Sequence, residues 1–417
     1  MKVALLTDCY LPRLGGIEVQ THDLAAHLVA RGHEVEVFTA TPGPRGERHG
    51  VVQPVDGIPV HRMAVRLPFE LPVNPLAPPE VRRRLEAGSF DVAHVHMGVV
   101  SPFATDMVGV AASIGLPTAV TWHCLMDRSA PLFRLLGQAR RWGAAGAALS
   151  AVSGVAATNV AAVVGDGVPV HVFPNGIDVD HWRAPGPVGQ GDDEGKGRPV
   201  RVVAAMRFAA RKRPLAVLEV AHRARQLAPA DVPMSLTLFG EGPERRRLEA
   251  YVRRHDLADW VSLPGRVSRE ELRAAYWDSD VYLTPARLEA FGIAALEART
   301  AGLPVVARRD TGVGDFVVDG VNGLLGSDDD ALAHGLARLV TDPGLRRAIA
   351  GTNRTVPPAQ AWSSVAALAE QEYARAAAAP GRRARGPARG GSGSGAGGAV
   401  ADGAVADGAV ADGAAGP

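Results

Sequence analysis

Short apolar runs rich in β-branched residues alternate with helical patterns along most of the chain, and this alternation constrains the fold most strongly. In the first half, an apolar run at 3–7 precedes an amphipathic pattern over about 18–30, and a second run covers 34–40. Two parallel strands need a crossover connection between them, which is usually a helix. The alternation therefore predicts parallel β-α-β units and an α/β fold class.

An irregular segment divides this pattern into two series. Between 183 and 199 the alternation stops in a Gly-rich, Pro-rich and acidic stretch that is typical of a linker. The expected strands are 91–96, 118–123, 148–153 and 170–173 before it, and 200–205, 235–239, 261–263, 281–284 and 304–307 after it. Two parallel-sheet domains of similar size follow, with a ligand cleft expected at the carboxyl ends of their strands.

The domain boundaries follow from these patterns. We expect one Rossmann-like domain over residues 1–182, the linker over 183–199 and a second Rossmann-like domain over 200–356. Helical spacing of apolar residues predicts a helix within 357–379. The tail, 380–417, is low in complexity and repeats Ala-Val-Ala-Asp-Gly, so it has too few apolar side chains for a core and is predicted to be disordered.

Charge is balanced over the 417 residues, with 45 Lys and Arg against 44 Asp and Glu. This balance gives no basis for a nucleic-acid partner, and any anion site must be local. Lysine occurs only at Lys2, Lys196 and Lys212, whereas every other cation is arginine. Lys212 stands out because it lies in a cationic loop directly after an expected strand.

The cysteines and the uncharged segments favour a cytoplasmic protein. Cys9 and Cys124 are too few for a disulfide framework and have no metal-ligand spacing. The apolar run at the N-terminus is too short for a signal peptide. Residues 143–164 carry no charge and could span a bilayer, but their small and polar side chains favour a buried strand followed by a helix.

The segment 284–297 is the first candidate site. A proline follows the expected strand, and a helix begins near Phe291, where free backbone amides can bind an anion and Gly292 admits a ligand close to the backbone. Glu289 precedes the helix and Glu297 lies about two turns into it. The two carboxylates can accept hydrogen bonds from sugar and ribose hydroxyls. The alternative is two solvated glutamates that flank a core phenylalanine.

The loop 205–214 is the second candidate site, because it places cations between a strand end and a helix that opens at Pro214. The guanidinium of Arg207 can donate two parallel hydrogen bonds to a diphosphate, whereas Lys212 supplies a point charge. The alternative is a solvated basic loop, which leaves the choice of lysine unexplained.

Two glycine-containing loops add weaker signals. Gly240 lies in Gly-Glu-Gly-Pro after an expected strand, but Arg245 takes the third glycine position of a dinucleotide fingerprint, so the loop argues little for NAD. Gly15 and Gly16 lie between the first strand and the first helix, which permits close approach of a ligand. Glycine pairs in such loops are also common for steric reasons alone.

In this order and spacing, the segments resemble family 4 glycosyltransferases, which are retaining enzymes of the GT-B fold; the resemblance covers about residues 1–373. It implies a nucleotide-sugar donor in the C-terminal domain, an acceptor on the N-terminal domain and a last helix that crosses back to the first domain. The matching segments are Gly15-Gly16, His94-Val95-His96, Trp122-His123, Pro174-Asn175-Gly176-Ile177-Asp178, Arg207 with Lys212, Gly240-Glu241-Gly242-Pro243, Glu289 with Glu297, and Ala301-Gly302-Leu303-Pro304-Val305-Val306.

The resemblance also implies roles for individual residues. Arg207 and Lys212 would hold the donor diphosphate and stabilise charge on the departing nucleotide. Glu297 would bind the ribose, and Glu289 the donor sugar. His123 would contact the donor sugar or the acceptor, with a hydrogen-bonded histidine at a strand end as the alternative. The predicted catalytic residues are His123, Arg207, Lys212 and Glu289, and the predicted donor-binding residues are Gly15, Gly16, Gly240, Phe291, Gly292, Ile293 and Glu297.

Two further histidines of the matching segments are not assigned to catalysis. His94 and His96 are expected to be structural, because strand alternation places both on one face. Retention in such enzymes is described without a protein nucleophile, since the acceptor hydroxyl attacks the face that the leaving phosphate vacates. No Asp-x-Asp metal motif is recognised in the sequence, so we expect metal-independent catalysis and no cofactor.

Four positions depart from the family's usual pattern and leave the identity of the donor, a UDP- or GDP-sugar, open. Met206 stands where glycine usually precedes the arginine, Arg213 where glycine often follows the lysine, and Arg287 where a small residue is common. Asp315 replaces the usual glutamate of a Gly-Gly-x-x-Glu loop. Two alternatives stay open: a sugar-nucleotide epimerase of the same fold, and a catalytically silent protein that binds nucleotide sugars.

The acceptor is expected to be a hydroxyl compound. The N-terminal half is similar to family members that glycosylate phosphatidylinositol, so a lipid or another cell-envelope glycan precursor is a candidate. Residues 131–142 combine leucines with arginines and could lie on an anionic membrane at its inner face. The alternative is a helix that covers the core and turns its arginines to water.

Overall fold

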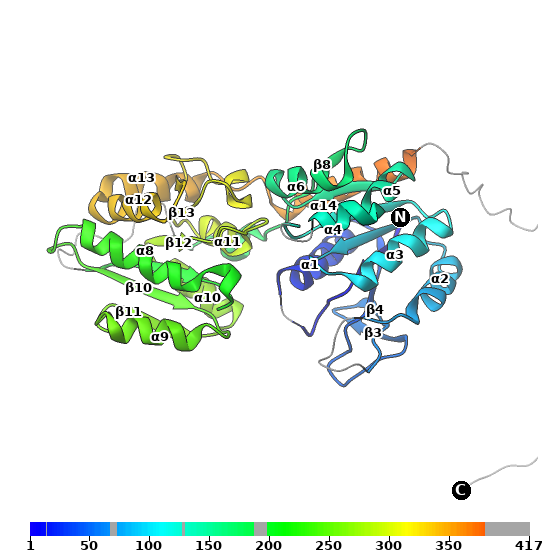
Figure 1. The fold of residues 1–417 in the computed structure, drawn as a ribbon, viewed down its shortest axis with the longest axis horizontal. Coiled ribbons are helices and arrows are strands. Elements are labelled where there is room, and N and C mark those ends of the chain that lie inside the picture. Colours follow the sequence, from blue (N-terminus) through cyan, green and yellow to red (C-terminus); the bar gives the residue numbers. More distant parts are fainter. Residues whose placement is uncertain (14, 67–72, 127–129, 187–197, 380–417) are drawn as a thin grey trace, which may run out of the picture. The chain divides into compact units, whose positions relative to one another are not determined.

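The computed structural model describes residues 1–13, 15–66, 73–126, 130–186 and 198–379. The central part of the predicted linker, 187–197, and the predicted tail, 380–417, lie outside these described residues. Two mainly parallel β-sheets with helices on their faces make up the described chain, as the alternating pattern predicts (Figure 1).

Among the described residues, the first sheet has eight strands in the order β3-β4-β2-β1-β5-β6-β7-β8. All neighbours are parallel except β3 and β4, which form an antiparallel hairpin at the edge. The strands of the first sheet are β1 Lys2–Thr7, β2 Glu34–Thr39, β3 Val51–Val55, β4 Ile58–Arg62, β5 Val92–Met97, β6 Thr118–Trp122, β7 Ala148–Ala151 and β8 Val170–Val172. The sequence analysis missed the hairpin, although Asp56 and Gly57 form its turn with positive φ, as Asp-Gly turns do.

The helices around this sheet refine two expectations. The first helix begins at Gly16 rather than near residue 18. The segment 131–142 holds two short helices rather than one, because Gly137 adopts a left-handed conformation with φ of 62° between them. The helices are α1 Gly16–Ala30, α2 Ala77–Ala87, α3 Pro102–Ser113, α4 Ala130–Leu136, α5 Gln138–Ala144, α6 Gly154–Val164, α7 Val179–Trp182 and α14 Trp362–Ala378.

The uncharged segment 143–164 contains the strand β7 and the helix α6, which confirms the expectation of a buried strand followed by a helix. Within the described ranges, no helix has both the length and the apolar character needed to cross a membrane.

In the described part of the chain, the second sheet has six strands, all parallel, in the order β11-β10-β9-β12-β13-β14. Its strands are β9 Val200–Ala205, β10 Met234–Phe239, β11 Val261–Gly265, β12 Val281–Thr284, β13 Val305–Arg308 and β14 Gly323–Gly326. Its helices are α8 Pro214–Leu227, α9 Arg245–Arg254, α10 Arg269–Trp277, α11 Ile293–Thr300, α12 Asp329–Thr341 and α13 Pro343–Thr355, with short 3₁₀ helices at Ala210–Lys212 and Gly312–Asp315.

Strand order places the candidate loops. The strand β9 lies between β10 and β12, so the chain moves from one side of β9 to the other and leaves a crevice at the carboxyl ends. The cationic loop follows β9 and the glutamate loop follows β12. Both loops therefore meet at one edge of the second sheet.

The helix α14 follows the second sheet in sequence but packs against the first. The Tyr373 hydroxyl lies 3.1 Å from Nδ1 of His94 on β5, and the Trp362 ring stacks on His27 of α1 with centroids 5.0 Å apart. The resemblance implied such a return of the last helix to the first domain.

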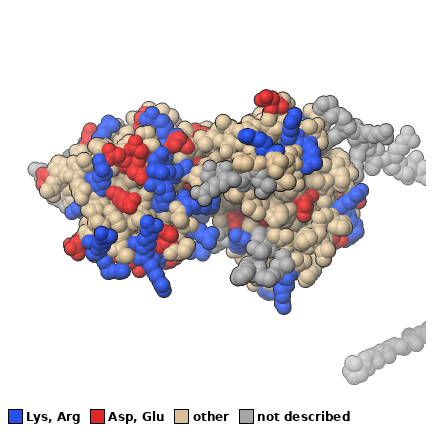
Figure 2. All heavy atoms as spheres, viewed as in Figure 1, with Lys and Arg blue, Asp and Glu red and all other residues tan. Residues whose placement is uncertain are grey.

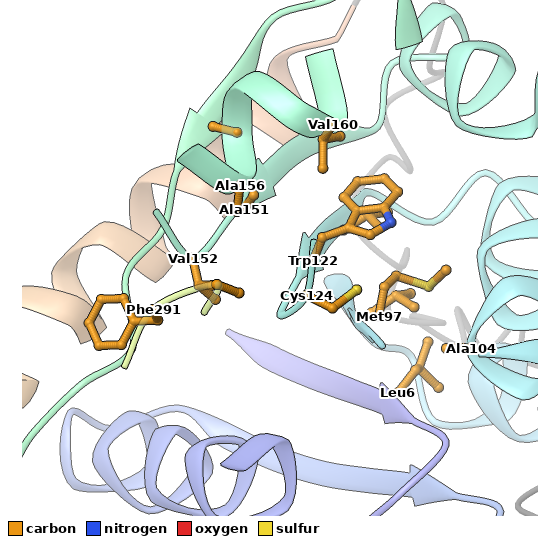
Figure 3. Close-up of a cluster of buried hydrophobic side chains, with 14 of the residues drawn as sticks. Leu6, Met97, Ala104, Trp122, Cys124, Ala151, Val152, Ala156, Val160 and Phe291 are labelled. Carbon is orange, nitrogen blue, oxygen red and sulfur yellow. The ribbon is translucent and has the colours of Figure 1, made fainter. Parts of the chain in front are cut away.

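Buried apolar side chains from both sheets belong to one contiguous cluster. Figure 3 shows Phe291, from the loop before α11, close to Val152, which follows β7 of the first sheet. Both side chains are almost fully buried. This packing holds the start of α11 against the first domain.

Candidate active site

An ion pair joins the two candidate loops. Nζ of Lys212 lies 2.5 Å from Oε2 of Glu289, and the two side chains are only 25% and 18% exposed. Lys212 ends the 3₁₀ turn after β9, and Glu289 lies in the loop after β12. The structure therefore brings together the lysine and the glutamate that the sequence analysis singled out separately.

The start of α11 lies beside this pair. Gly292 is the residue before the helix and has a φ of 96°, and no side chain caps the first amides. A Cβ at Gly292 would lie 3.5 Å from Cγ of Glu289 and 2.6 Å from Cγ2 of Val313. Glycine is required here by both the positive φ and the close packing, and the uncapped amides are available to an anion.

Phe291 and Ile293 are placed differently by the fold. The Phe291 side chain is 2% exposed and its ring packs against Phe316, so only its backbone can face a ligand. The Ile293 side chain reaches the start of α1, where a Cβ on Gly16 would lie 3.2 Å from Cδ1 of Ile293. Gly16 and neighbouring Gly15 thus lie beside the start of α11, although they belong to the first sheet's domain.

The carboxyl of Glu297 lies near Asp23 of α1 and Arg269 of α10. Burial raises the pKa of its carboxyl to about 8, the positive charge of Arg269 opposes this, and the negative charge of Asp23 adds to it. Arg269 and Asp23 themselves approach to 3.8 Å. Glu297 is therefore mainly protonated at neutral pH and can donate as well as accept a hydrogen bond.

Two arginines of the cationic loop are exposed. The side chains of Arg207 and Arg211 make no hydrogen bond or ion pair within the described residues. The charge of Arg211 is near enough to affect the Cys124 thiol, next to His123. Both guanidiniums are available to an anionic ligand, and the sequence analysis named only Arg207.

The unusual residues at Arg213 and Arg287 converge on one carboxylate. Arg213 has a φ of 56°, the left-handed region that favours glycine. Its guanidinium donates to Asp329 at the start of α12 and to the carbonyl of Pro285, and Arg287 lies 3.9 Å from the same Asp329. The strain of an arginine in a conformation that favours glycine is thus offset by hydrogen bonds that join the cationic loop to the loop after β12.

Asp315 and Met206, the other two departures from the family's pattern, also have defined contacts in the structure. Oδ2 of Asp315 accepts a hydrogen bond of 2.7 Å from the amide of Gly154, the first residue of α6. A Cβ at Gly240, where φ is 140°, would lie 1.8 Å from the carbonyl oxygen of Met206. Close packing of two backbones therefore explains Gly240, and its donor-binding role stays a prediction.

His123 follows β6 and is held inside the protein. Its Nε2 lies 2.9 Å from Nδ1 of His96, and its side chain also forms a hydrogen bond with Asn175. Burial lowers the pKa of His123 to about 4, so the ring is neutral at pH 7. Among the described residues, no hydrogen bond or ion pair joins His123 to Lys212 or Glu289, and its catalytic role stays a prediction.

His94 and His96 are fully buried and hydrogen-bonded, as expected for structural residues. The contact between His96 and His123 was not anticipated, because it joins neighbouring strands that are distant in sequence. Asn175 belongs to the quoted Pro-Asn-Gly segment, but no role was assigned to it.

The sequence does contain acidic pairs with Asp-x-Asp spacing, which the sequence analysis overlooked, and in the structure one aspartate of each pair caps a helix or binds an arginine. Asp178 caps α7, Asp280 binds Arg198, and Asp328 caps α12. Within the described ranges, no three His, Cys, Asp or Glu residues are placed to hold a metal ion. A further surface hollow is lined by residues of α8, α9 and α12, and it contains none of the predicted site residues.

Comparisons with known proteins agree with this architecture. Residues 14–181 match the family model described as Glycosyltransferase Family 4, and residues 193–356 match Glycosyl transferases group 1. Among solved structures, the chain resembles sucrose-phosphate synthase from Thermosynechococcus elongatus, with 20% identity, a TM-score of 0.67 and coverage of 90% of this chain and 98% of that one. It also resembles Anabaena HepE in complex with UDP, with 18% identity, a TM-score of 0.69 and coverage of 90% and 100%. These likenesses show the fold.

Sequence relatives show the family. The chain is 30% identical to a D-inositol 3-phosphate glycosyltransferase of Xylanimonas cellulosilytica over 394 residues, which cover 87% of this chain and 92% of the relative. It is 29% identical to a GDP-mannose-dependent phosphatidylinositol monomannoside mannosyltransferase of Mycolicibacterium smegmatis over 83% of this chain and 90% of that protein. The chain therefore belongs to glycosyltransferase family 4, and it is a retaining glycosyltransferase of the GT-B fold.

Proposed function

We propose that this glycosyltransferase moves a sugar from a UDP- or GDP-sugar to a hydroxyl of an inositol phosphate, either free or as the head group of phosphatidylinositol. The names of the relatives support this acceptor class, and they lend no support to an epimerase. The observation that carries the donor site is the Lys212–Glu289 ion pair beside the uncapped start of α11.

The donor diphosphate binds between the cationic loop and the start of α11. Arg207 is free to bind it with two parallel hydrogen bonds, and Lys212 exchanges Glu289 for a phosphate oxygen. Negative charge grows on the diphosphate as the bond to the sugar breaks, so the two cations stabilise the transition state more than the bound donor.

The released Glu289 carboxylate accepts hydrogen bonds from hydroxyls of the donor sugar, and Glu297 binds the ribose. The acceptor oxygen attacks the sugar on the face that the phosphate leaves, and its proton passes to the departing phosphate oxygen. No protein nucleophile takes part in this step. Neutral His123 contributes a hydrogen bond to the sugar or the acceptor rather than a charge.

Thermal unfolding with UDP-, GDP- and ADP-sugars tests the donor site. A ligand at 100 times its dissociation constant stabilises the folded state by about 2.7 kcal/mol. We expect the UDP- or the GDP-sugar to raise the melting temperature of the wild type, and Lys212→Ala and Glu289→Ala to abolish the increase. Glu34→Ala, which removes an exposed carboxylate on β2, is the control and should retain it.

Turnover separates an enzyme from a silent binding protein. We expect Glu289→Ala to lower kcat/KM by about 100-fold or more, as when an interaction at the reacting centre is lost. Donor binding without any transfer to inositol phosphate or phosphatidylinositol would favour the silent protein. Transfer unchanged in folded Glu289→Ala would refute the site assignment.

The acceptor assay needs two arms, because free and lipid-bound inositol phosphate share one head-group chemistry. One arm offers soluble inositol phosphate, and the other offers vesicles that contain phosphatidylinositol. Transfer only in the vesicle arm would assign a lipid acceptor, and transfer only in the soluble arm would exclude it.

We also propose that α4 and α5 contact an anionic membrane when the acceptor is a lipid. Leu135 is 84% exposed and Leu136 is 48% exposed, and Arg134, Arg140 and Arg141 of the same two helices are also exposed. Figure 2 shows Lys and Arg side chains on the part of the surface where Figure 1 places α5. Leucines that insert between head groups and arginines that attract anionic lipids act together at an interface.

Vesicle flotation tests this contact. We expect the protein to float with anionic vesicles at low salt, and we expect the double variant Leu135→Ser with Leu136→Ser to float less. Val318→Ser, at an exposed site in the second domain, is the control. Equal flotation with neutral and anionic vesicles would contradict the role of the arginines.

A further inference from the structure

Two histidines on β5 share one face but have different partners. His94 bonds to Thr121 of β6 through Nε2, at 2.8 Å, and to the Tyr373 hydroxyl of α14 through Nδ1, at 3.1 Å. His96 lies one ring away, with centroids 4.2 Å apart, and its Nδ1 is 2.9 Å from Nε2 of His123. Only the second histidine touches His123.

The proton positions in the His96–His123 pair follow from burial. Burial lowers the pKa of both rings, so each is neutral and carries one proton at pH 7. One nitrogen of the 2.9 Å contact must therefore donate and the other accept.

The groups around the two rings indicate whether Nδ1 of His96 or Nε2 of His123 carries the proton of this hydrogen bond. Nε2 of His96 is buried and has no hydrogen-bond partner in the described structure. A buried N–H without a partner is rarer than an acceptor without one, so His96 carries its proton on Nδ1 and donates it to His123. Asn175 also forms a hydrogen bond with the His123 side chain.

A small cavity borders this pair. His96, His123 and Asn175 line it together with Gln20 of α1 and Trp362 of α14. Gln20 is held by two hydrogen bonds to the backbone of Gly176, at 2.8 and 3.0 Å, so the walls of the cavity are fixed. The rings of His96 and His123 therefore lie where β5, the end of β6, α1 and α14 of the first domain meet.

We propose that His96 is a positioning residue that holds His123 in the tautomer with its proton on Nδ1 and fixes the plane of the ring. In this tautomer the ring of His123 has its one N–H at Nδ1, so a sugar or acceptor oxygen that binds to the ring must accept from Nδ1 and take the place of any protein partner there. The catalytic consequence rests on the proposed function of His123. The hydrogen bond itself does not.

Substitutions at His96 separate positioning from packing. Asparagine places an amide near the position of Nδ1 and keeps a hydrogen-bond donor for His123. Phenylalanine keeps a ring of similar volume but has no hydrogen-bond donor. His94→Phe is the matched control, because His94 is equally buried on the same strand and does not contact His123. Where His96→Phe does not fold, His96→Gln serves, since its amide lies beyond the Nδ1 position.

Nitrogen-15 NMR of the histidine rings in the full chain tests the hydrogen bond without any activity assay. We expect the pattern of a proton on Nδ1 for His123 in the wild type, in His96→Asn and in His94→Phe. In His96→Phe or His96→Gln, we expect the His123 signals to move toward a mixture of the two tautomers. A wild-type pattern in those variants, or a proton on Nε2 of His123 in the wild type, would overturn the proposal.

Kinetics test the consequence. We expect His96→Phe to lower kcat by about 10-fold to 100-fold, the range for residues that orient a functional histidine, with a smaller change in the donor KM. His96→Asn should restore most of the loss, and His94→Phe should cause none beyond its effect on stability. If His123→Ala keeps full activity, the proposed role of His123 fails while the NMR result stands. An equal loss of kcat in His94→Phe and His96→Phe would refute the positioning role.

Discussion

At the scale of single residues, the site combines strained and buried groups that local sequence patterns do not reveal. Arg213 adopts a left-handed backbone conformation that normally selects glycine, and its guanidinium holds Asp329 and the Pro285 carbonyl. These contacts fix the position of Arg213, which directly follows Lys212. The contacts of the arginine side chain therefore offset the strain that its left-handed backbone conformation causes.

Substitutions at Arg213 should separate these two effects. Arg213→Ala loses the contacts with Asp329 and keeps the positive φ, so we expect the free energy of unfolding to fall by about 1 to 3 kcal/mol. Arg213→Gly loses the same contacts but relieves the strain, and we expect it to be about 1 kcal/mol more stable than Arg213→Ala. Urea denaturation measures both. Equal stability of the two variants would contradict the strain at this position.

Glu297 should make stability depend on pH. Burial raises its pKa in the folded protein from 4.5 to about 8, so the folded state keeps the proton that the unfolded chain loses. Its stabilising effect is complete below pH 4.5 and declines as the pH rises to about 8. We expect the stability of the wild type relative to Glu297→Gln to fall by at least about 1 kcal/mol between pH 5 and pH 8.

Urea denaturation at several pH values measures this difference. Glu34→Gln, which removes an exposed carboxylate, is the matched control. A difference between wild type and Glu297→Gln that stays constant from pH 5 to pH 8 would show that Glu297 is charged in the folded protein.

At the scale of elements, α14 completes the first domain although it follows the second in sequence. Trp362 is 4% exposed, stacks on His27 and covers Gly176, where a Cβ would lie 2.3 Å from the indole ring. Glycine at this position is therefore required by the packing of α14. The helix also supplies Tyr373 to the histidine cluster beside His123.

Loss of the indole ring should loosen this helix. We expect Trp362→Ala to lower the free energy of unfolding by about 3 to 5 kcal/mol, the usual cost of removing a large buried aromatic side chain. Hydrogen exchange should show the loss of protection in α14 and α1 rather than in α12 of the second domain. Trp260→Ala, at a partly buried site beside the second core, is the control for tryptophan removal. Equal loss of protection in α1 and α12 would contradict this division.

At the scale of the whole molecule, the proposed transfer relies on charge supplied by arginine and lysine side chains. In the parts of the chain that the structure describes, no cluster of His, Cys, Asp or Glu residues is arranged to hold a metal ion. Net charge is close to zero, so in the proposed donor site the positive potential at the diphosphate would come from the cationic loop. Metal-independent catalysis stays a prediction.

A chelator tests that prediction. We expect turnover after exhaustive treatment with EDTA to equal that of the untreated enzyme, because Arg207 and Lys212 supply the charge that a metal supplies in other transferases. Activity that the chelator abolishes and a divalent ion restores would refute it. Lys212→Ala should lower turnover whether or not divalent ions are present.

Local patterns predicted most of the architecture. Alternating strands and helices indicated both parallel sheets, and the order of motifs indicated family 4. The missed hairpin at β3 and β4 carried its own signal at Asp56-Gly57. The break between α4 and α5 was not anticipated, because a single glycine inside a helical pattern is often tolerated.

The sequence by itself determined the fold class, the family and the loops that carry charge, because periodicity and turn residues act over short distances along the chain. Only the tertiary structure decided which groups meet. It pairs Lys212 with Glu289, places Glu297 near Asp23 of α1 and brings His96 into contact with His123. Such contacts depend on strand order and burial, which join residues far apart in sequence and shift their proton affinities.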